Sequence, residues 1–301
     1  VFVLGSSFGS PGGAPLMLQL VNHLRRKGYF VSVALTRPFG FEGARKLEQA
    51  DALIEAMEEV AHLMVVVDQD VLTKASAELT MPEASAIADK TLQYTVRSIL
   101  WALKAPEILK VSHGEFLWHG RDLRAMKRPL FPPMMSLLTC PGHGYMGRGQ
   151  AAIPSASMQQ AGLPSMLSTL AEDAVRAASE SPFLDDKMPT ATAVLCVLRL
   201  PRSIMDPTSK YRPAQLPVPP QSAGTYNENY REYALRSAVQ VAALTVKELA
   251  GPRCCDIVVC PQLQEEGEEG LPGSSASMDG GSDDILSVEC SLLVLKAIED
   301  M

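Results

Sequence analysis

Glycines gather in one short segment that could bind a phosphate group. Gly9, Gly12 and Gly13 lie between a predicted buried strand at residues 1–4 and a predicted helix over Leu16–Lys27. Backbone N–H groups that no side chain shields, placed beside a helix N-terminus, are suited to bind phosphate oxygens. Neither G-x-G-x-x-G nor the P-loop pattern G-x-x-x-x-G-K-S/T is present, so phosphate binding and an ordinary tight turn are both open readings.

The elements around this loop follow the order strand, helix, strand. The helix over Leu16–Lys27 ends at Gly28, a residue suited to a helix C-terminus, and Phe30–Leu35 is the next predicted strand. Such a crossover joins parallel strands and places the glycine loop at the carboxyl end of the first one, where ligands bind in parallel sheets. A predicted helix over residues 44–60 and a predicted strand over residues 63–67 continue the pattern. The sequence therefore predicts an α/β fold.

The longest predicted element is a helix from Pro82 to about Lys104. Pro82 suits the first turn of a helix, where the N–H that it lacks would have no partner. Apolar residues then recur at helical spacing as far as Leu103, and the next Gly or Pro is Pro106. At 1.5 Å per residue this helix would be roughly 30–35 Å long, about the width of a domain. It is therefore expected to contact the elements that precede it and those that follow it.

The chain after this helix is predicted to begin with a loop, Ala105–Glu115, followed by a helix over Phe116–Lys127. Two Pro-rich stretches, residues 128–141 and 201–224, read as insertions, and residues 264–284 read as an acidic, Gly/Ser-rich loop. The other predicted elements are helices over residues 171–179 and 230–249 and strands over residues 191–200, 255–260 and 285–298.

Composition and charge argue against several classes of function. A chain of 301 residues with 47% apolar and 20% charged residues is typical of a soluble globular protein with one or two domains. The net charge of −7 argues against nucleic-acid partners, and the apolar runs are too short to span a bilayer. Six cysteines show no C-x-x-C pair, so no metal site is predicted. The first residues already read as a buried strand, so we expect the chain to begin within a domain.

One segment resembles a known family. Thr36-Arg37-Pro38-Phe39-Gly40-Phe41-Glu42-Gly43 is similar to the T-K/R-P-F-x-F-E-G segment of FtsZ, the bacterial and plastid division GTPase related to tubulin. Other similar segments follow in the family's order: a turn like N-D-x-L-L at Gln69–Leu72, the long helix, a segment like M-G-x-A-x-x-G-x-G at Gly142–Gly149, and S-P-F-L at Ser181–Leu184.

The resemblance implies the tubulin/FtsZ fold and its domains. Residues 1–81 would form the C-terminal part of a GTPase-type nucleotide domain with a parallel sheet, and the family's first strands would lie before Val1. Residues 82–104 would be the central helix that joins the two domains. Residues 105–301 would supply a loop and a second α/β domain with a mixed sheet.

The resemblance also implies a GTP or GDP site, which this sequence alters. The family's phosphate loop, G-G-G-T-G-T-G, aligns with the stretch from Gly9 to Pro15, so Gly9, Gly12 and Gly13 are the candidate phosphate-binding residues. Both threonines are absent here, and Pro11 and Pro15 each remove an N–H donor. GTP or GDP is thus the candidate cofactor, and its binding is left open.

Two other candidate residues match the family's ribose and base contacts. Glu42 stands at the acid that contacts the ribose, and Lys46 replaces the arginine four residues later, which loses a planar bidentate fork. On the long helix, Asp89 matches the carboxylate that reads guanine, while Ser85 replaces the phenylalanine that lies against the base. A solvated surface acid is the alternative reading of Asp89.

The loop after the long helix differs most from the family. In FtsZ this loop reads N-x-D-x-x-D, enters the nucleotide pocket of the next subunit and positions the attacking water, a weak nucleophile that needs such partners. Here Lys110 replaces the asparagine, Ser112 replaces the first aspartate, and Glu115 alone keeps an acid. We therefore predict that the catalytic positions, Ser112 and Glu115, are degenerate. His113 could act as a base, but a lone loop histidine is usually only solvated.

Two functions follow from this resemblance. The first is a regulator in the chloroplast stroma that contacts FtsZ subunits or filaments, and other plastid-division factors, and that restrains or positions Z-ring assembly. The second is a diverged but active GTPase that polymerises, in which Glu115 would do the work of both aspartates. An unrelated α/β domain with a chance match is a third reading, which a nucleotide-binding loop upstream of Val1 would exclude. Nucleic acid and a membrane span are not expected.

Overall fold

The computed structural model describes residues 1–6, 13–75, 79–112, 114–120, 132–139, 142–154, 162–184, 186–204, 223–264 and 285–296. Most of the two Pro-rich stretches and nearly all of the acidic stretch lie outside these residues, as do Gly9, Gly12 and His113.

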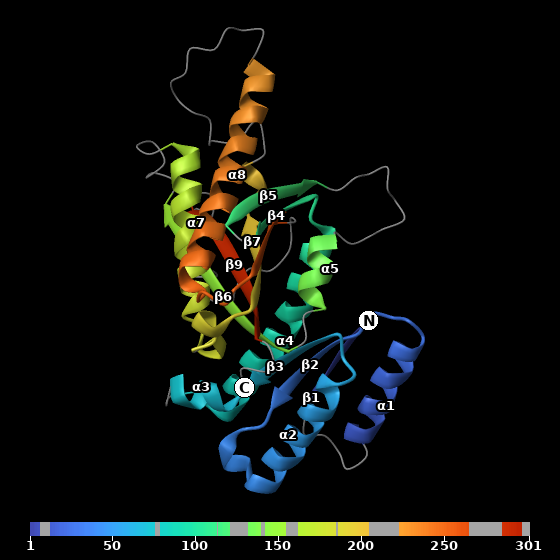
Figure 1. The fold of residues 1–301 in the computed structure, drawn as a ribbon. Coiled ribbons are helices and arrows are strands. Elements are labelled where there is room, and N and C mark those ends of the chain that lie inside the picture. The colour runs from blue at the N-terminus through green and yellow to red at the C-terminus, as the bar shows by residue number, and fades with distance from the viewer. Residues whose placement is uncertain are drawn as a thin grey trace.

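Within the described residues, the strands form one mixed sheet in the order β1-β2-β3-β6-β9-β7-β8-β4-β5 (Figure 1). The first three strands are parallel, as the strand–helix–strand pattern predicts, and the later strands include antiparallel pairs. The α/β fold with a mixed sheet is therefore confirmed. The strands are β1 (Phe2–Ser6), β2 (Ser32–Arg37), β3 (Leu63–Asp68), β4 (Glu107–Ser112), β5 (Glu115–Gly120), β6 (His143–Pro154), β7 (Ala193–Leu200), β8 (Asp256–Leu263) and β9 (Ile285–Lys296).

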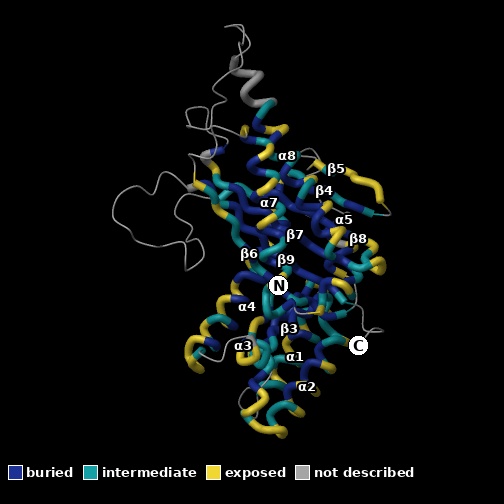
Figure 2. The backbone as a smooth tube through the Cα atoms, turned by 90° about the vertical axis from the view of Figure 1, so that its left-hand side faces the viewer, coloured by how far each residue is buried: buried dark blue, intermediate teal, exposed yellow. Residues whose placement is uncertain are grey.

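Helices cover both faces of this sheet. α1 and α2 pack on one face of β1–β3, and α4 packs on the opposite face. α5 lies on the same face of the sheet as α4 but packs against β7 and β8. α7 and α8 cover β7, β8 and β9 from the other side, so buried residues form layers above and below the strands (Figures 1 and 2). The helices are α1 (Gly13–Arg26), α2 (Ala44–Glu58), α3 (Asp70–Ala75), α4 (Met81–Lys104), α5 (Pro132–Leu138), α7 (Leu163–Ser179) and α8 (Ala223–Leu249), with 3-10 turns η1 (Gly40–Glu42), η3 (Pro182–Leu184), η4 (Met188–Thr190) and η5 (Arg202–Ile204).

The long helix α4 matches its prediction within one residue. Thr80 and Glu83 form a capping box, in which the Glu83 carboxylate accepts the Thr80 N–H at 2.9 Å, so two donors at the helix start are satisfied. The buried face of α4 contacts β2 and β3 as well as β7 and β8. α4 therefore connects what we call the first half, with β1–β3, to the second half, with β4–β9.

A short pairing joins the two halves at the level of the sheet. Met64 and Val65 of β3 pair with His143 and Gly144 of β6, and the two strands separate beyond this point. The expected parallel and mixed sheets are thus continuous with each other. A Cβ on Gly144 would meet Val65 and the backbone of Met64, so this close approach favours glycine.

The segment after α4 differs from its prediction. Glu107–Ser112 is strand β4 rather than a loop, and Glu115–Gly120 is strand β5 rather than the start of a helix. β4 lies between β5 and β8, and its Ile108 and Leu109 are fully buried. Gly114, with φ +87°, closes the turn between β4 and β5 in a conformation that glycine adopts readily. Burial of apolar side chains against β8 therefore draws this segment into the sheet.

Glycines in β6 allow a helix to lie directly on the sheet. A Cβ on Gly149 would overlap backbone atoms of Ala174 and Ala178 in α7, and a Cβ on Gly147 would overlap Leu184 of η3. The pattern that resembles M-G-x-A-x-x-G-x-G thus serves packing in this chain. Part of the Pro-rich stretch 128–141 forms α5, which packs against the α4 face of the sheet.

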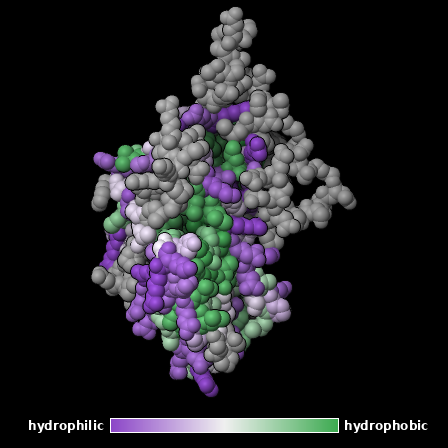
Figure 3. Space-filling model, turned by 90° about the vertical axis from the view of Figure 1, so that its right-hand side faces the viewer, coloured by the Kyte–Doolittle hydropathy of each residue, from purple (hydrophilic) through white to green (hydrophobic). Residues whose placement is uncertain are grey.

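One side of the molecule carries a band of hydrophobic side chains, on the side where Figure 1 places α1 and α5 (Figure 3). Val1 and Leu4 at the β1 end of the sheet, and Leu16 and Leu20 of α1, remain exposed. A search of the described residues finds no helix both long enough and apolar enough to cross a bilayer.

Candidate functional site

The carboxyl ends of three parallel strands meet at one edge of the first half. Ser6 ends β1, Arg37 ends β2 and Asp68 ends β3, so the segments that follow these strands lie close together. The segment Thr36–Gly43 leaves β2 at this edge. Gly13 is the first residue of α1 and stands on the same side of the sheet.

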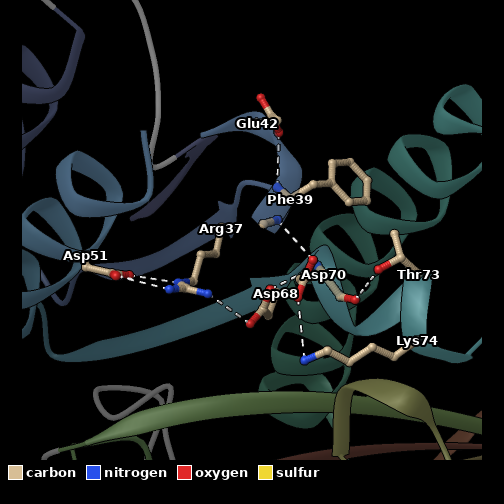
Figure 4. A network of polar contacts seen from close by, with 9 residues as sticks. Arg37, Phe39, Glu42, Asp51, Asp68, Asp70, Thr73 and Lys74 are labelled. Carbon is tan, nitrogen blue, oxygen red and sulfur yellow. Dashed lines mark hydrogen bonds and ion pairs between the residues drawn. The ribbon is translucent and has the colours of Figure 1, made fainter. Parts of the chain in front are cut away.

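An arginine at this edge is held by two aspartates. Arg37 donates from Nε to Asp51 Oδ1 at 2.7 Å and from Nη2 to Asp51 Oδ2 at 3.0 Å, a bidentate pair between β2 and α2 (Figure 4). Its Nη1 lies 3.4 Å from Asp68 Oδ2. The hydrogen bonds between the two groups raise the pKa of Arg37 and lower the pKa of Asp51. This geometry fixes the direction in which the chain leaves β2.

A second carboxylate ties this loop to α3. Asp70 Oδ1 accepts the Gly40 N–H at 2.9 Å, and Asp70 itself donates its N–H to Asp68 Oδ1 at 3.0 Å (Figure 4). Lys74 Nζ lies 3.5 Å from Asp70 Oδ2. Phe39 is buried against Leu72 and helix α4. The Thr36–Gly43 segment is therefore anchored by polar contacts on one side and by an apolar contact on the other.

The predicted ribose contacts, Glu42 and Lys46, lie together. Glu42 Oε1 accepts the Phe39 N–H at 3.0 Å, and Glu42 Oε2 accepts from Lys46 Nζ at 3.1 Å. Both carboxylate oxygens are thus engaged by the protein's own chain. A ribose hydroxyl would have to share or displace these contacts.

The other predicted nucleotide contacts are not joined to this pair. Asp89 is exposed on α4, and Ser85 is half-buried one turn before it. Among the described residues, no hydrogen bond or ion pair is found for Asp89, which agrees with the reading of a solvated surface acid. Gly9 and Gly12 lie outside the described residues, so of the predicted phosphate loop only Gly13 is placed.

The predicted catalytic residues lie at the opposite end of the sheet. Ser112 pairs with Glu115 across the β4–β5 hairpin and with Asp256 of β8, whereas β1–β3 form the other end of the strand order. Lys110 Nζ lies 2.9 Å from Asp256 Oδ1. The structure therefore places Ser112 and Glu115 at the turn end of the β4–β5 hairpin, in paired strands and not in the open loop that the resemblance implies.

Helix α8 fixes the same hairpin from its other face. Arg236 lies 5.3 Å from the ring centre of Trp118 and 3.3 Å from the Glu107 carboxylate. Lys247 Nζ lies 5.9 Å from the ring centre of Phe116. Cation–aromatic contacts of this kind are typically worth about 0.5–1 kcal/mol at exposed sites. Both strands of the hairpin are thus attached to the body of the second half.

Two cavities lie where β3 and β6 separate, on either side of the Ser181–Leu184 segment. The first, of about 850 Å³, is lined by Arg37, Asp68 and His143 among others. The second, of about 670 Å³, lies along α4. His143 Nε2 contacts Glu58 Oε1, and burial lowers the pKa of His143 to about 4. In the described part of the chain, no three His, Cys, Asp or Glu side chains come together as a metal site.

Sequence reasoning missed the polar network around Arg37. Asp51 lies in a predicted helix at a position that no motif marks, Asp68 directly follows the predicted strand over residues 63–67, and Asp70 belongs to the turn that resembles N-D-x-L-L. The signal for this network is that charged residues end two neighbouring parallel strands, Arg37 in β2 and Asp68 in β3. The carboxyl ends of such strands meet at one edge of the sheet, so these side chains can be expected to lie close together. No sequence pattern marks Asp51, the partner of Arg37 that α2 provides.

Comparison with known proteins points to one family. FtsZ cell-division proteins from Rhizobium radiobacter and Pseudomonas aeruginosa are 30% and 26% identical to the chain over 159 and 184 residues, which are 52% and 61% of this chain and 24% and 38% of those proteins. No protein-family model matches the chain.

Solved structures match nearly the whole chain. An empty FtsZ dimer from M. jannaschii has a TM-score of 0.60 at 17% identity, covering 99% of this chain and 64% of that one. A GTPγS-bound CetZ2 protofilament from Haloferax volcanii has a TM-score of 0.51 at 15% identity, covering 98% and 64%. The chain thus spans somewhat less than two thirds of these structures, and its match to the Rhizobium radiobacter relative covers about a quarter of that protein. The chain has the FtsZ/tubulin fold, and the relatives that its sequence matches are FtsZ cell-division proteins.

Proposed function

We propose that this chain is part of an FtsZ-like regulator of plastid division. It resembles the plant and algal plastid-division protein called Accumulation and Replication of Chloroplasts three. In this proposal it acts in the chloroplast stroma, contacts FtsZ subunits or filaments together with other division factors, and restrains or positions Z-ring assembly. Filament-forming relatives make a filament-like contact with true FtsZ subunits the most direct way to act.

One observation carries the proposal: the segment that would activate water in a neighbouring subunit is a β-hairpin of the sheet. Ser112 and Glu115 face each other at the hairpin end, and Lys110 is paired with Asp256. A residue that positions water must reach the reacting atoms within about 3 Å. A hairpin attached to β8 and α8 is held in its own subunit, so we infer that it does not reach into a neighbouring nucleotide pocket and that this subunit adds no hydrolysis at such a contact.

The nucleotide side supports the same inference. Both oxygens of Glu42 are already bound by Phe39 and Lys46, and Pro11 and Pro15 remove donors from the phosphate loop. GTP or GDP binding is therefore expected to be weak compared with FtsZ. A subunit that joins a filament without supporting GTP hydrolysis would cap the filament end or inhibit its further growth.

Sedimentation of plastid FtsZ tests this function. Purified FtsZ with GTP would be pelleted with and without substoichiometric full-length protein, and phosphate release would be measured in the same tubes. We expect fewer pelleted filaments and no added turnover. Co-pelleting with added turnover would instead identify a polymerising GTPase.

Two variants separate these outcomes. Ser112→Asp with Glu115→Asp restores both family acids, and we expect no turnover from it because the hairpin and the glycine loop are unchanged. If the protein does hydrolyse GTP, Glu115→Gln should abolish this activity, whereas Asp173→Asn, at an exposed acid of α7 that lines neither cavity, should leave it intact. Turnover that depends on Glu115 would overturn the proposal.

A further inference from the structure

A mostly apolar cavity lies between α3, α4 and the start of β6, elements that come together in Figure 2. Its volume is about 670 Å³, within the range of small-molecule sites. Leu72, Ile87, Met146 and Phe183 supply apolar walls. Arg148 of β6 lies in the same wall, so a guanidinium group borders a space that is otherwise largely hydrophobic.

The charge of Arg148 is only partly balanced. Arg148 Nη2 lies 3.9 Å from Glu289 Oε2, while Arg199 Nη1 lies 2.8 Å from the same oxygen. Glu289 and Arg199 are 4% and 3% exposed, so this carboxylate belongs chiefly to Arg199. Among the described residues, no other carboxylate is found within ion-pair distance of Arg148. Both guanidinium groups thus approach the buried Glu289 carboxylate, and Arg148 is the more distant of the two.

Aromatic rings of α4 hold both guanidinium groups in place. The Arg148 guanidinium carbon lies 3.1 Å from the ring centre of Tyr94, and that of Arg199 lies 4.2 Å from the ring centre of Trp101. A ring face offsets part of a cation's charge but does not replace an anion. Burial lowers the pKa of Arg148, as expected for a cation with too little negative charge around it.

We propose that this cavity binds a small aliphatic carboxylate, with the apolar chain against Leu72, Ile87 and Phe183 and the carboxylate on Arg148. The ligand would supply the negative charge that Arg148 lacks, and the pair would be strong because it forms away from water. Glu83 and Lys90 of α4 also line the cavity, and their charges are opposite, so the net charge of the lining is the one positive charge of Arg148. One positive charge fits a monoanion better than a phosphate-rich ligand, and the apolar walls disfavour small hydrophilic anions.

The same arrangement provides a reporter of binding. A carboxylate on Arg148 would draw this guanidinium away from Glu289 and alter the contact between Arg199 and Trp101. Trp118 lies on β5, at the far edge of the sheet. In full-length protein with Trp118→Phe, and with any other Trp of that protein replaced by Phe, the fluorescence therefore comes from Trp101 alone.

The probe is decanoate, compared with decan-1-ol, which has the same chain and no charge. Saturable change in Trp101 fluorescence with decanoate is expected, and decanol should bind at least about tenfold more weakly. Arg148→Met should weaken decanoate binding by a similar factor and leave decanol unchanged. Arg97→Met is the matched control, because Arg97 also approaches the Tyr94 ring, at 5.8 Å, but is not part of the cavity wall.

Three results would overturn the proposal: no saturable binding of decanoate, equal binding of decanoate and decanol, or unchanged decanoate binding by Arg148→Met. If Arg148→Met does not fold, Arg148→Lys keeps the charge and should keep the preference for decanoate. Decanoate and decan-1-ol can also be compared on protein that keeps Arg148, and this comparison tests the proposal without any variant at that position.

Discussion

The Lys110 ammonium group lies 2.9 Å from the Asp256 carboxylate, which joins the segment after the central helix to strand β8. Lys110 stands where the family has an asparagine of its hydrolysis loop, and Asp256 is the first residue of β8. This ion pair joins residues that are far apart in the sequence, so it holds the segment after α4 against strand β8. The hairpin that contains Ser112 and Glu115 therefore depends on the second half of the chain.

Lys110→Met should loosen this hairpin. The Lys110 side chain is 18% exposed, so its loss leaves a partly buried Asp256 without its partner. We expect the free energy of unfolding in urea to fall by about 1 kcal/mol. Lys74→Met removes a largely exposed pair with Asp70 and should cause a much smaller change. Equal effects of the two variants would show that the Lys110 pair does not hold the hairpin.

Gly149→Ala should destabilise the protein strongly. The added Cβ would overlap backbone atoms of α7, so either β6 or the helix must move, at a cost of about 3 kcal/mol. Gly120→Ala, at the end of β5, is the matched control, because a Cβ there meets nothing within 4 Å. Thermal unfolding followed by circular dichroism measures both. A tolerated Gly149→Ala would mean that α7 does not rest on this strand.

Glu289→Gln should destabilise the protein, because it removes a buried negative charge from the sheet beneath α4. Arg199 is buried with Glu289, and the half-buried Arg148 lies near the same carboxylate, so neutralising Glu289 removes an anion that both guanidinium groups approach. We expect a loss of about 3 kcal/mol in urea unfolding. Glu248→Gln breaks a pair with Arg176 that is exposed on the surface, and stability should change little. If the two variants behaved alike, the buried carboxylate would have no special role.

His143 gives a pH dependence with a defined sign. Its pKa is about 4 in the folded protein because of burial, whereas the unfolded chain binds a proton near pH 6.5. Its contribution to stability is therefore complete above about pH 6.5 and is lost as the pH falls toward 4. Glu58, whose pKa is raised by burial, contributes in the opposite sense.

The His143→Gln variant isolates this contribution. The difference in unfolding free energy between the unaltered protein and this variant should decline between pH 6.5 and pH 4, by at most about 3 kcal/mol. A constant difference for His143→Gln would mean that His143 titrates normally.

The sequence carried enough information for the elements with strong local signals. Pro82, the apolar spacing and the capping box define α4, and the runs of Val and Leu in β2, β3 and β7 define buried strands. The resemblance at Thr36–Gly43 indicates the fold and marks Glu42 and Lys46 as one candidate contact, and the structure shows these two side chains hydrogen-bonded. These features depend on neighbours in the sequence, which a pattern can reveal.

The elements that were missed depend on distant partners. Phe116 and Leu117 have spacing that also suits a helix, but they pair with Val111 and Lys110 of β4. β4 in turn pairs with β8, more than a hundred residues later, which no local pattern reveals. β6 contains several glycines, which disfavour strands, yet the approach of α7 requires them. The partners of Arg37 come from α2 and β3, so its network appears only once the chain has folded.

Hydrogen exchange in β4 tests the central claim most directly. As the strand between β5 and β8, it should have amide protons at Leu109 and Val111 that exchange at least about a hundredfold more slowly than an unstructured chain, as in other core strands. Measured in the full-length protein, such protection would show that this segment belongs to the sheet, as the inferred loss of the hydrolysis loop requires. Exchange at the rate of an open loop would contradict the account and favour an active hydrolysis loop carrying Ser112 and Glu115.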